Sequence, residues 1–302
     1  MRVDPSYINN LVGALDNAQS NQQQLTSEMS SGVRVTSLSQ DPMASGENVR
    51  LLNQIQEDDS FTQTTNQVSG QLNVADSALG QVVTQLTSAI SLATSANNGT
   101  LNSSDEKSIS SELAGIRSEV LVLANSDYQG QYIFAGGQSS STPFSLNSST
   151  SPATVTYSGD SNINYLQTPD GQNIQLNVPG NQIFQGSGAN NVFTALNNLV
   201  ADYASGTVNV GQATTDLANL NTALNYVSQQ RVTVDNSITQ LSTASTAVTN
   251  EQTQLTGTQT TLMQADVAQL STQLSLNETQ QAALEAVIAK LGTGSLFDKL
   301  PG

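Results

Sequence analysis

The 302-residue sequence contains no cysteine, no histidine and no tryptophan. Without cysteine the chain can form no disulfide and offers no thiolate nucleophile. Without histidine it lacks the most common proton-transfer side chain and a common zinc ligand. The catalytic arrangements that depend on these side chains are excluded. We therefore expect neither an enzyme nor a bound metal or cofactor.

Charged and aromatic residues are also scarce, at 11% and 4% of the sequence. So few aromatic side chains argue against one large globular core, and the surface must consist mainly of Gln, Asn, Ser and Thr. A polar surface with little charge repels its own copies weakly, which suits a protein that packs against many copies of itself. A compositional bias of the organism is the alternative explanation.

The few charges are unbalanced, with 24 acidic and eight basic residues and a net charge of −16. The basic residues are scattered, so no basic patch could neutralise a nucleic-acid backbone or an anionic membrane surface, and we expect neither partner. No apolar run approaches the about 20 residues of a membrane span. The N-terminus lacks the apolar core of a cleaved signal peptide, so we expect any export to use an uncleaved signal.

Helical periodicity is abundant. From Leu217 to Leu255, stripe positions recur at alternating steps of three and four, the pattern of a helix that buries a narrow apolar stripe against another helix. At about 1.5 Å per residue this helix would be roughly 60 Å long. One apolar stripe cannot stabilise it alone, so the chain must supply a partner. The phase of the pattern is lost near Gly257.

Arg231 occupies one position of this heptad stripe. It could set the helix register or pair with a carboxylate on a neighbouring helix. Alternatively, its aliphatic stem packs on the stripe while its guanidinium reaches water. We favour the second interpretation.

Two shorter heptad stripes lie near the chain ends, from Ile8 to Met29 and from Val267 to Leu291, and Gly32 suits a helix C-cap after the first. Isolated helices of this length are marginal in water. We therefore expect residues 1–40 and 260–302 to be largely disordered in the free chain and to become helical on assembly. The alternative is stable pairing within one chain. The expected assembly interface comprises Ile8, Leu11, Leu15, Leu25, Met29, Arg34, Leu270, Leu274, Leu284, Ile288 and Leu291.

Asp41-Pro42 predicts a helix start, with Asp as N-cap and Pro at the first helical position. The stripe that follows weakens through a polar stretch at residues 57–67 and recovers to about residue 96. We interpret it as one long helix that Gly70 could break. We expect Asp58 and Asp59 to lie on a solvated helix face.

An Asn-Asn-Gly turn at residues 97–99 separates this helix from the next. Ser103 and Glu106 fit a capping box, and a further apolar stripe follows. Residues 42–127 thus predict a helical hairpin against which the stripe from Leu217 would pack.

From Gln131 the periodicity changes from that of a helix to that of a strand. Residues 131–137, with the sequence QYIFAGG, predict a short aromatic strand followed by a glycine turn. Pro169-Asp170-Gly171 predicts the turn of a hairpin. Helix resumes at Val192 and breaks at Gly206 and Gly211.

These patterns predict a mainly α fold with a small β-rich insertion, arranged as an elongated layered rod. We expect three domains. Residues 1–40 plus 260–302 would form a terminal coiled coil, residues 41–130 plus 191–259 a long-helix bundle, and residues 131–190 an outer β domain.

Several short motifs carry a family resemblance. Met29-Ser30-Ser31-Gly32, Arg34 and Asp41-Pro42 look like the N-terminal signature of the flagellin superfamily, and Ala265-Asp266-Val267-Ala268 looks like its C-terminal segment. Met1-Arg2-Val3 and the QYIFAGG motif resemble the members that form the hook–filament junction. Two positions depart from the family pattern: Val33 stands where a basic residue is common, and Gln40 where Asp is common.

The resemblance implies a structural subunit of the bacterial flagellum that joins hook-associated protein 1 to flagellin by helical self-assembly. It also implies a flagellar export chaperone, unfolded passage through the type III export channel and an extracellular location. A minor filament flagellin is the alternative within the family. A coiled-coil signalling protein or a periplasmic adaptor is the alternative outside it. The first normally needs a membrane span or sensor domain, and the second two repeated helical hairpins with strands.

Overall fold

The computed structural model describes residues 5–97 and 101–293. The chain divides into two compact units. The terminal unit comprises Met1–Asp58 and Asn250–Gly302, and the central unit comprises Asp59–Thr249. The predicted Met1-Arg2-Val3 motif, residues 98–99 of the predicted turn and the last nine residues of the predicted C-terminal segment lie outside the described residues.

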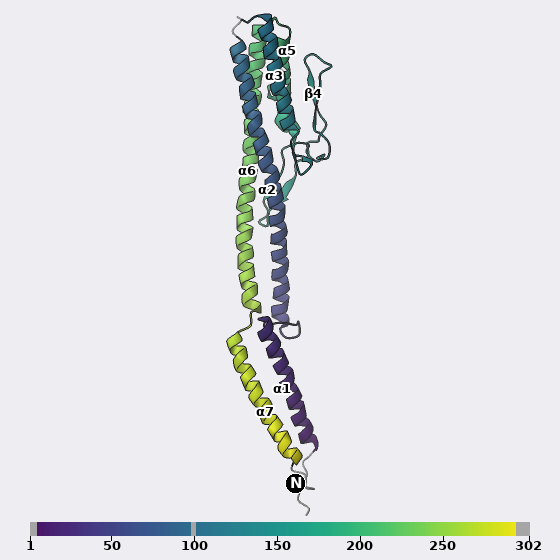
Figure 1. The fold of residues 1–302 in the computed structure, drawn as a ribbon, viewed down its shortest axis with the longest axis vertical. Helices are drawn as coiled ribbons and strands as arrows, with labels where there is room; N and C mark the ends of the chain where they lie inside the picture. Colours follow the sequence, from purple (N-terminus) through teal and green to yellow (C-terminus); the bar gives the residue numbers. More distant parts are fainter. Residues whose placement is uncertain (1–4, 98–100, 294–302) are drawn as a thin grey trace, which may run out of the picture. The chain divides into compact units, whose positions relative to one another are not determined.

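Most of the described chain is helical, as predicted. α1 (Pro5–Ser31), α2 (Pro42–Ala96) and α3 (Ser103–Ala124) precede the β-rich region, and α5 (Val192–Ala204), α6 (Val210–Met263) and α7 (Val267–Thr293) follow it (Figure 1). α2 and α6 contribute residues to both units. The prediction of a mainly helical chain with a small β region is confirmed. None of the described helices is long and apolar enough to span a membrane.

The helix ends follow local sequence signals, with some corrections. Gly32 has a φ of 68°, a left-handed conformation that glycine adopts without steric cost, so it ends α1 as predicted. Asp41 caps α2, because its Oδ1 accepts the N–H of Ala44 at 3.0 Å. The capping box at Ser103 was wrong: the preceding Asn102 caps α3 by accepting the N–H groups of Ser104 and Asp105. Because α3 begins at Ser103, the N-cap position belongs to Asn102.

The long helix predicted over residues 42–96 is confirmed as α2, and Gly70 does not break it. A Cβ at Gly70 would stand 2.5 Å from the Tyr128 hydroxyl, so a tertiary contact explains the glycine. The break predicted at Gly211 does not occur, because Gly211 lies inside α6, as does Gly257. Gly206, in contrast, ends the preceding helix with a φ of 71°.

The β-rich region consists of three separate antiparallel hairpins. β1 (Asp127–Tyr128) pairs with β2 (Gln131–Tyr132), β3 (Phe144–Asn147) with β4 (Thr154–Tyr157), and β5 (Tyr165–Gln167) with β6 (Asn173–Gln175). The hairpin predicted around residues 169–171 is confirmed. The short helix α4 (Gly180–Phe184) and a 3₁₀ turn (Gly188–Asn190) lead into α5.

The QYIFAGG motif is a strand for only its first two residues, so the predicted longer strand was wrong. Ile133, Phe134 and Ala135 are buried in the core instead. Although Phe134 lies outside the strand, its carbonyl oxygen is hydrogen-bonded, because it accepts the N–H of Gly180 at 2.8 Å. Gly136 adopts a φ of 69°, and Asp160 holds the turn by accepting the N–H of Gly137 at 2.7 Å. This N–H and that of Asn162 lower the pKa of Asp160.

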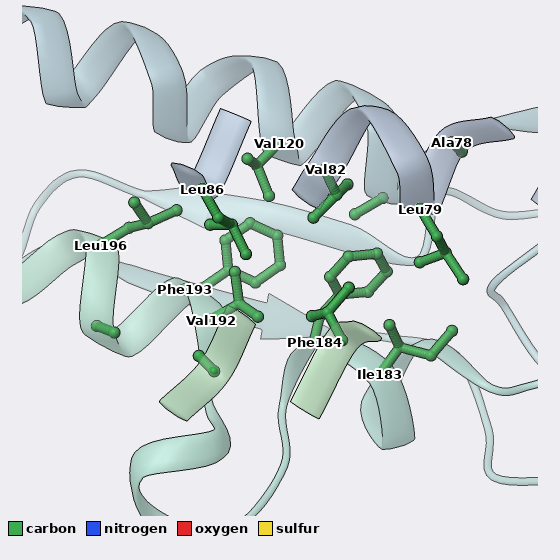
Figure 2. Close-up of a cluster of buried hydrophobic side chains, with 14 of the residues drawn as sticks. Ala78, Leu79, Val82, Leu86, Val120, Ile183, Phe184, Val192, Phe193 and Leu196 are labelled. Atoms are coloured by element: carbon green, nitrogen blue, oxygen red, sulfur yellow. The ribbon is translucent and has the colours of Figure 1, made fainter. Parts of the chain in front are cut away.

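An aromatic cluster joins the β-rich region to the helices of the central unit. Phe184 packs edge-on against Phe134 and Phe144, with ring centroids 5.5 and 5.4 Å apart, and lies 5.9 Å from Phe193. Figure 2 shows that the surrounding aliphatic side chains converge on these rings from several elements. They include Leu79, Val82, Leu86, Val120, Ile183, Val192 and Leu196.

Arg231 pairs with a carboxylate on the neighbouring helix, which is the alternative that we did not favour, while its side chain remains 39% exposed. Its Nε donates to Asp76 Oδ1 at 2.6 Å and its Nη2 to Asp76 Oδ2 at 3.1 Å. Gly80 leaves room beside the guanidinium, since a Cβ there would lie 3.4 Å from Arg231 Cζ. The hydrogen bond from Arg231 lowers the pKa of Asp76. The bidentate pair links α2 to α6 in the central unit.

Asp58 and Asp59 of α2, both expected on a solvated helix face, differ in solvent exposure. Asp59 is exposed, but Asp58 is buried, and so is Thr65 one heptad further along. Both therefore occupy stripe positions, and the prediction for Asp58 was wrong. The weak middle of the α2 stripe is a run of buried polar residues rather than a gap in the stripe.

A second electrostatic feature lies where α5 meets α6. Asp202 faces the charge of Asp216, whose oxygens accept the Gln212 and Asn198 amides at 2.7 and 3.1 Å. Burial, and then the charge of Asp216, raise the pKa of Asp202 to about 6. The fold therefore favours the protonated form of Asp202.

We expect Phe184→Ala to lower the free energy of unfolding by about 3–5 kcal/mol, because it removes a fully buried ring that contacts three others. Urea unfolding followed by circular dichroism measures the change. Tyr165→Ala is the matched control, because Tyr165 is exposed, and it should change stability by no more than about 0.5 kcal/mol. Equal effects of the two substitutions would contradict the assigned core.

We expect Asp202→Asn to stabilise the central unit at neutral pH and to have little effect near pH 4. Because the folded pKa of Asp202 lies above its ordinary 3.8, its favourable contribution is complete below 3.8 and is lost as the pH rises through about 6. Asp202 remains partly exposed, so the gain should be on the order of 1 kcal/mol. Urea midpoints across pH measure it, with Asp170→Asn in an exposed turn as control. A gain that is independent of pH would exclude this explanation.

Candidate assembly interface

The terminal unit pairs the two ends of the chain. α1 and α7 lie side by side and run antiparallel (Figure 1). The Nδ2 of Asn277 lies 3.0 Å from the carbonyl oxygen of Ala18, and Ser271 Oγ lies 3.8 Å from Met29 Sδ. The two predicted terminal stripes therefore face each other.

The predicted interface residues are brought together but are incompletely covered. Leu270 is buried, and Ile8 and Met29 are exposed. The other apolar members are half-buried, namely Leu11, Leu15, Leu25, Leu274, Leu284, Ile288 and Leu291. Among the described residues of α1 and α7, only Ala18, Glu28, Leu270 and Asn277 are buried. A two-helix contact of this kind leaves most of its stripe partly open to solvent.

Further apolar side chains outside these stripes are exposed on the same two helices. Leu276 is 65% exposed, and Tyr7, Val12 and Val287 are between 40% and 51% exposed. Sequence reasoning missed them because it followed one stripe per helix. Leu276 and Val287, eleven residues apart, lie on a second face of α7, since eleven residues make about three helical turns.

The connections between the helices are paired with each other within the terminal unit. The N–H of Arg34 donates to the Met263 carbonyl at 2.7 Å, and the N–H of Ala265 donates to the Gly32 carbonyl at 3.0 Å. Val33 and Gln264 form an isolated antiparallel bridge between these bonds. The main chain therefore ties the α1–α2 connection to the α6–α7 connection.

Arg34, a predicted interface residue, makes its contacts within the chain. Its Nη1 lies 3.2 Å from Asp41 Oδ2, and its Nη2 donates to the Leu262 carbonyl at 3.3 Å. The N–H of Ala44, and then the hydrogen bond from Arg34, lower the pKa of Asp41. Asp41 thus serves as the helix cap and as the counter-ion of Arg34.

Gln40 organises the connection between α1 and α2. Its Oε1 accepts the N–H groups of Thr36 and Ser37 at 2.7 and 3.1 Å, and its Nε2 donates to Glu28 at 3.4 Å.

A cavity of about 420 Å³ lies beside the paired connections. None of the side chains that line it is ionisable. They belong to Gly32, Val33, Asn48, Gln259, Thr260, Met263 and Gln264. Within the described ranges, no group of three or more acidic side chains could hold a metal ion. The features of this unit that could act on a partner are thus apolar helix surface and hydrogen-bonding groups.

Comparison with known proteins agrees with this arrangement. Residues 7–139 match the family described as the bacterial flagellin N-terminal helical region. Over 187 residues the chain is 32% identical to flagellar hook-associated protein 3 of Salmonella typhimurium. That alignment covers 62% of this chain and 57% of the relative, so the match spans little more than half of the relative's length.

Two solved structures share the fold. A Vibrio parahaemolyticus structure ascribed to a flagellar hook-associated protein has a TM-score of 0.66 and 19% identity, and covers 74% of this chain and 99% of its own. The flagellar junction protein FlgL from Legionella pneumophila has a TM-score of 0.54 and 15% identity, and covers 65% of this chain and 99% of its own. The chain is therefore similar to flagellar hook-associated protein 3 in sequence and fold, and its residues 7–139 match the N-terminal helical region of bacterial flagellin.

Proposed function

We propose that this chain is a non-enzymatic structural subunit that joins the flagellar hook to the filament. The observation that carries the proposal is its homology to hook-associated protein 3 combined with an incompletely covered pair of terminal helices. In this function the chain assembles with copies of itself, and contacts hook-associated protein 1 on one side and flagellin on the other. It lies outside the cell, and it reaches that place with an export chaperone and without a cleaved signal.

The terminal helices are the surface through which the subunits join. Half-buried stripe residues and the exposed Leu276 and Val287 leave apolar area that neighbouring copies can cover. The central unit has a fully buried aromatic core of its own. Residues 1–40 and 260–302 therefore act as the assembly domain, disordered in the free chain and helical once neighbours cover them.

We expect the free full-length chain to show no helical excess over a shortened chain of residues 41–260. α1 and α7 have 27 residues each, so their complete folding would add a signal that circular dichroism detects readily. The excess should appear only after assembly. A full helical excess in chains shown to be monomeric by sedimentation would mean that the ends pair stably before assembly.

We expect Leu276→Gln to weaken assembly by at least about tenfold while leaving the free chain as stable as before. Leu276 is exposed in the single chain, so its apolar contact arises only between copies. Val122→Gln is the matched control, because Val122 on α3 is 71% exposed but belongs to the central unit. Sedimentation velocity measures the change in vitro.

In cells, a strain that lacks the protein should keep its hooks but shed flagellin monomers. The wild-type chain and Val122→Gln should restore filaments, and Leu276→Gln should not. Electron microscopy of the purified, polymerised chain separates this function from that of a filament flagellin. Long filaments formed by this chain alone would favour the flagellin alternative.

A further inference from the structure

Two polar residues interrupt the apolar stripe by which α7 contacts α1. Asn277 and Gln281 occupy consecutive stripe positions between Leu274 and Leu284. Asn277 is buried, and Gln281 is half-buried. A polar side chain at such a position removes hydrophobic stabilisation, so its hydrogen bonds must serve another purpose.

Both amides converge on a single main-chain acceptor. Asn277 Nδ2 and Gln281 Nε2 lie 3.0 and 2.9 Å from the carbonyl oxygen of Ala18, in the interior of α1. Gln281 Nε2 also lies 3.3 Å from Asn277 Oδ1, which links the two side chains. A carbonyl oxygen has two lone pairs, so besides its helical bond the Ala18 oxygen has one acceptor position, which the two amides share. These contacts join a side-chain pair on α7 to one residue of α1.

The acceptor lies at the one position of the α1 stripe with a small side chain. That stripe consists of Ile8, Leu11, Leu15, Ala18, Gln22, Leu25 and Met29. Because the side chain of Ala18 ends at Cβ, α7 can approach closely enough for its amides to reach the main chain. Ala18 is itself buried by this approach.

A slip of one heptad would destroy this arrangement. It would place Asn277 opposite Leu11 or Leu25 instead of Ala18. A leucine side chain there would keep α7 away from the α1 backbone, and the buried amides would lose their acceptor. An amide that is buried without a hydrogen-bond partner is strongly disfavoured. The slipped alignments are therefore excluded, although their leucine contacts would be nearly as good.

We propose that Asn277 and Gln281, acting on the carbonyl of Ala18, set the register in which the two ends of the chain pair. The inference rests on the proposed function, in which these helices form the assembly layer. A slip of one heptad would displace Leu276 and Val287 by about 10 Å along α1, so that neighbouring copies would meet mismatched surfaces. The polar pair gives every subunit the same terminal geometry, at a cost in stability.

The absence of cysteine allows a direct test with engineered disulfides. Met29→Cys with Ser271→Cys reports the observed register, since these side chains are in contact. Gln22→Cys with Ser271→Cys reports a slip of one heptad, in which Asn277 would face Leu11. Each full-length double-cysteine chain is equilibrated in glutathione buffer. The share of intrachain disulfide is then measured by mass spectrometry after digestion.

In the otherwise unaltered chain, the observed-register disulfide should exceed the slipped one by at least about tenfold. Introducing Asn277→Leu with Gln281→Leu should raise the slipped disulfide relative to the observed-register disulfide by about tenfold or more. Ala18→Leu should shift the ratio in the same direction from the acceptor side.

Leu284→Ala is the matched control, because it weakens the same stripe without touching the polar pair. It should lower the yield of both disulfides and leave their ratio unchanged. An unchanged ratio in the double-leucine variant would overturn the proposal. Comparable yields of the two disulfides in the unaltered chain, or no yield of either, would also overturn it.

The ratio is measured on free chains without hook or filament, so it can fail or hold independently of the proposed function. At exchange equilibrium, the ratio of the two disulfides reflects the relative stability of the two alignments, even where the helices pair only part of the time. Formation of long filaments by the purified chain would contradict the junction function and leave the register result standing. A lost register preference would leave the homology and the cell-based tests untouched.

Discussion

A helix that carries one narrow apolar stripe is stable only when another helix covers that stripe. The central unit meets this requirement within the chain, because α2, α3, α5 and α6 share one core that includes fully buried leucines and phenylalanines. The terminal unit meets it only partly, since most stripe residues of α1 and α7 are half-buried. The apolar residues of the central unit are thus covered within the chain, whereas those of α1 and α7 stay partly open to solvent.

The features predicted correctly from sequence depend on neighbouring residues along the chain. α2 begins and ends where the Asp-Pro start and the stripe indicate, and Gly32 ends α1, because caps and periodicity are local. The pairing of α1 with α7 follows from two stripes of equal length. At the predicted interface, sequence identifies the stripe members but not the exposed Leu276, which belongs to no stripe.

The features predicted wrongly depend on a tertiary partner. The spacing of residues around Arg231 says nothing about Asp76, 155 positions away in sequence. The QYIFAGG motif has a strand-like composition, yet Phe134 leaves the strand because the aromatic cluster buries its ring. In each case a long-range contact outweighs the local preference.

Polar residues within the stripes have a common physical consequence. Apolar stripes made of leucine, valine and alanine pack almost equally well after a shift of seven residues, so hydrophobic burial alone specifies alignment weakly. A directional contact removes that degeneracy, because it can form in one alignment only. In the central unit Arg231 and Asp76 provide such a contact, and in the terminal unit Asn277 and Gln281 provide one through Ala18. In the assembly that we propose, where each copy would present the same surface to its neighbours, a unique alignment matters more than the additional stability of an uninterrupted apolar stripe.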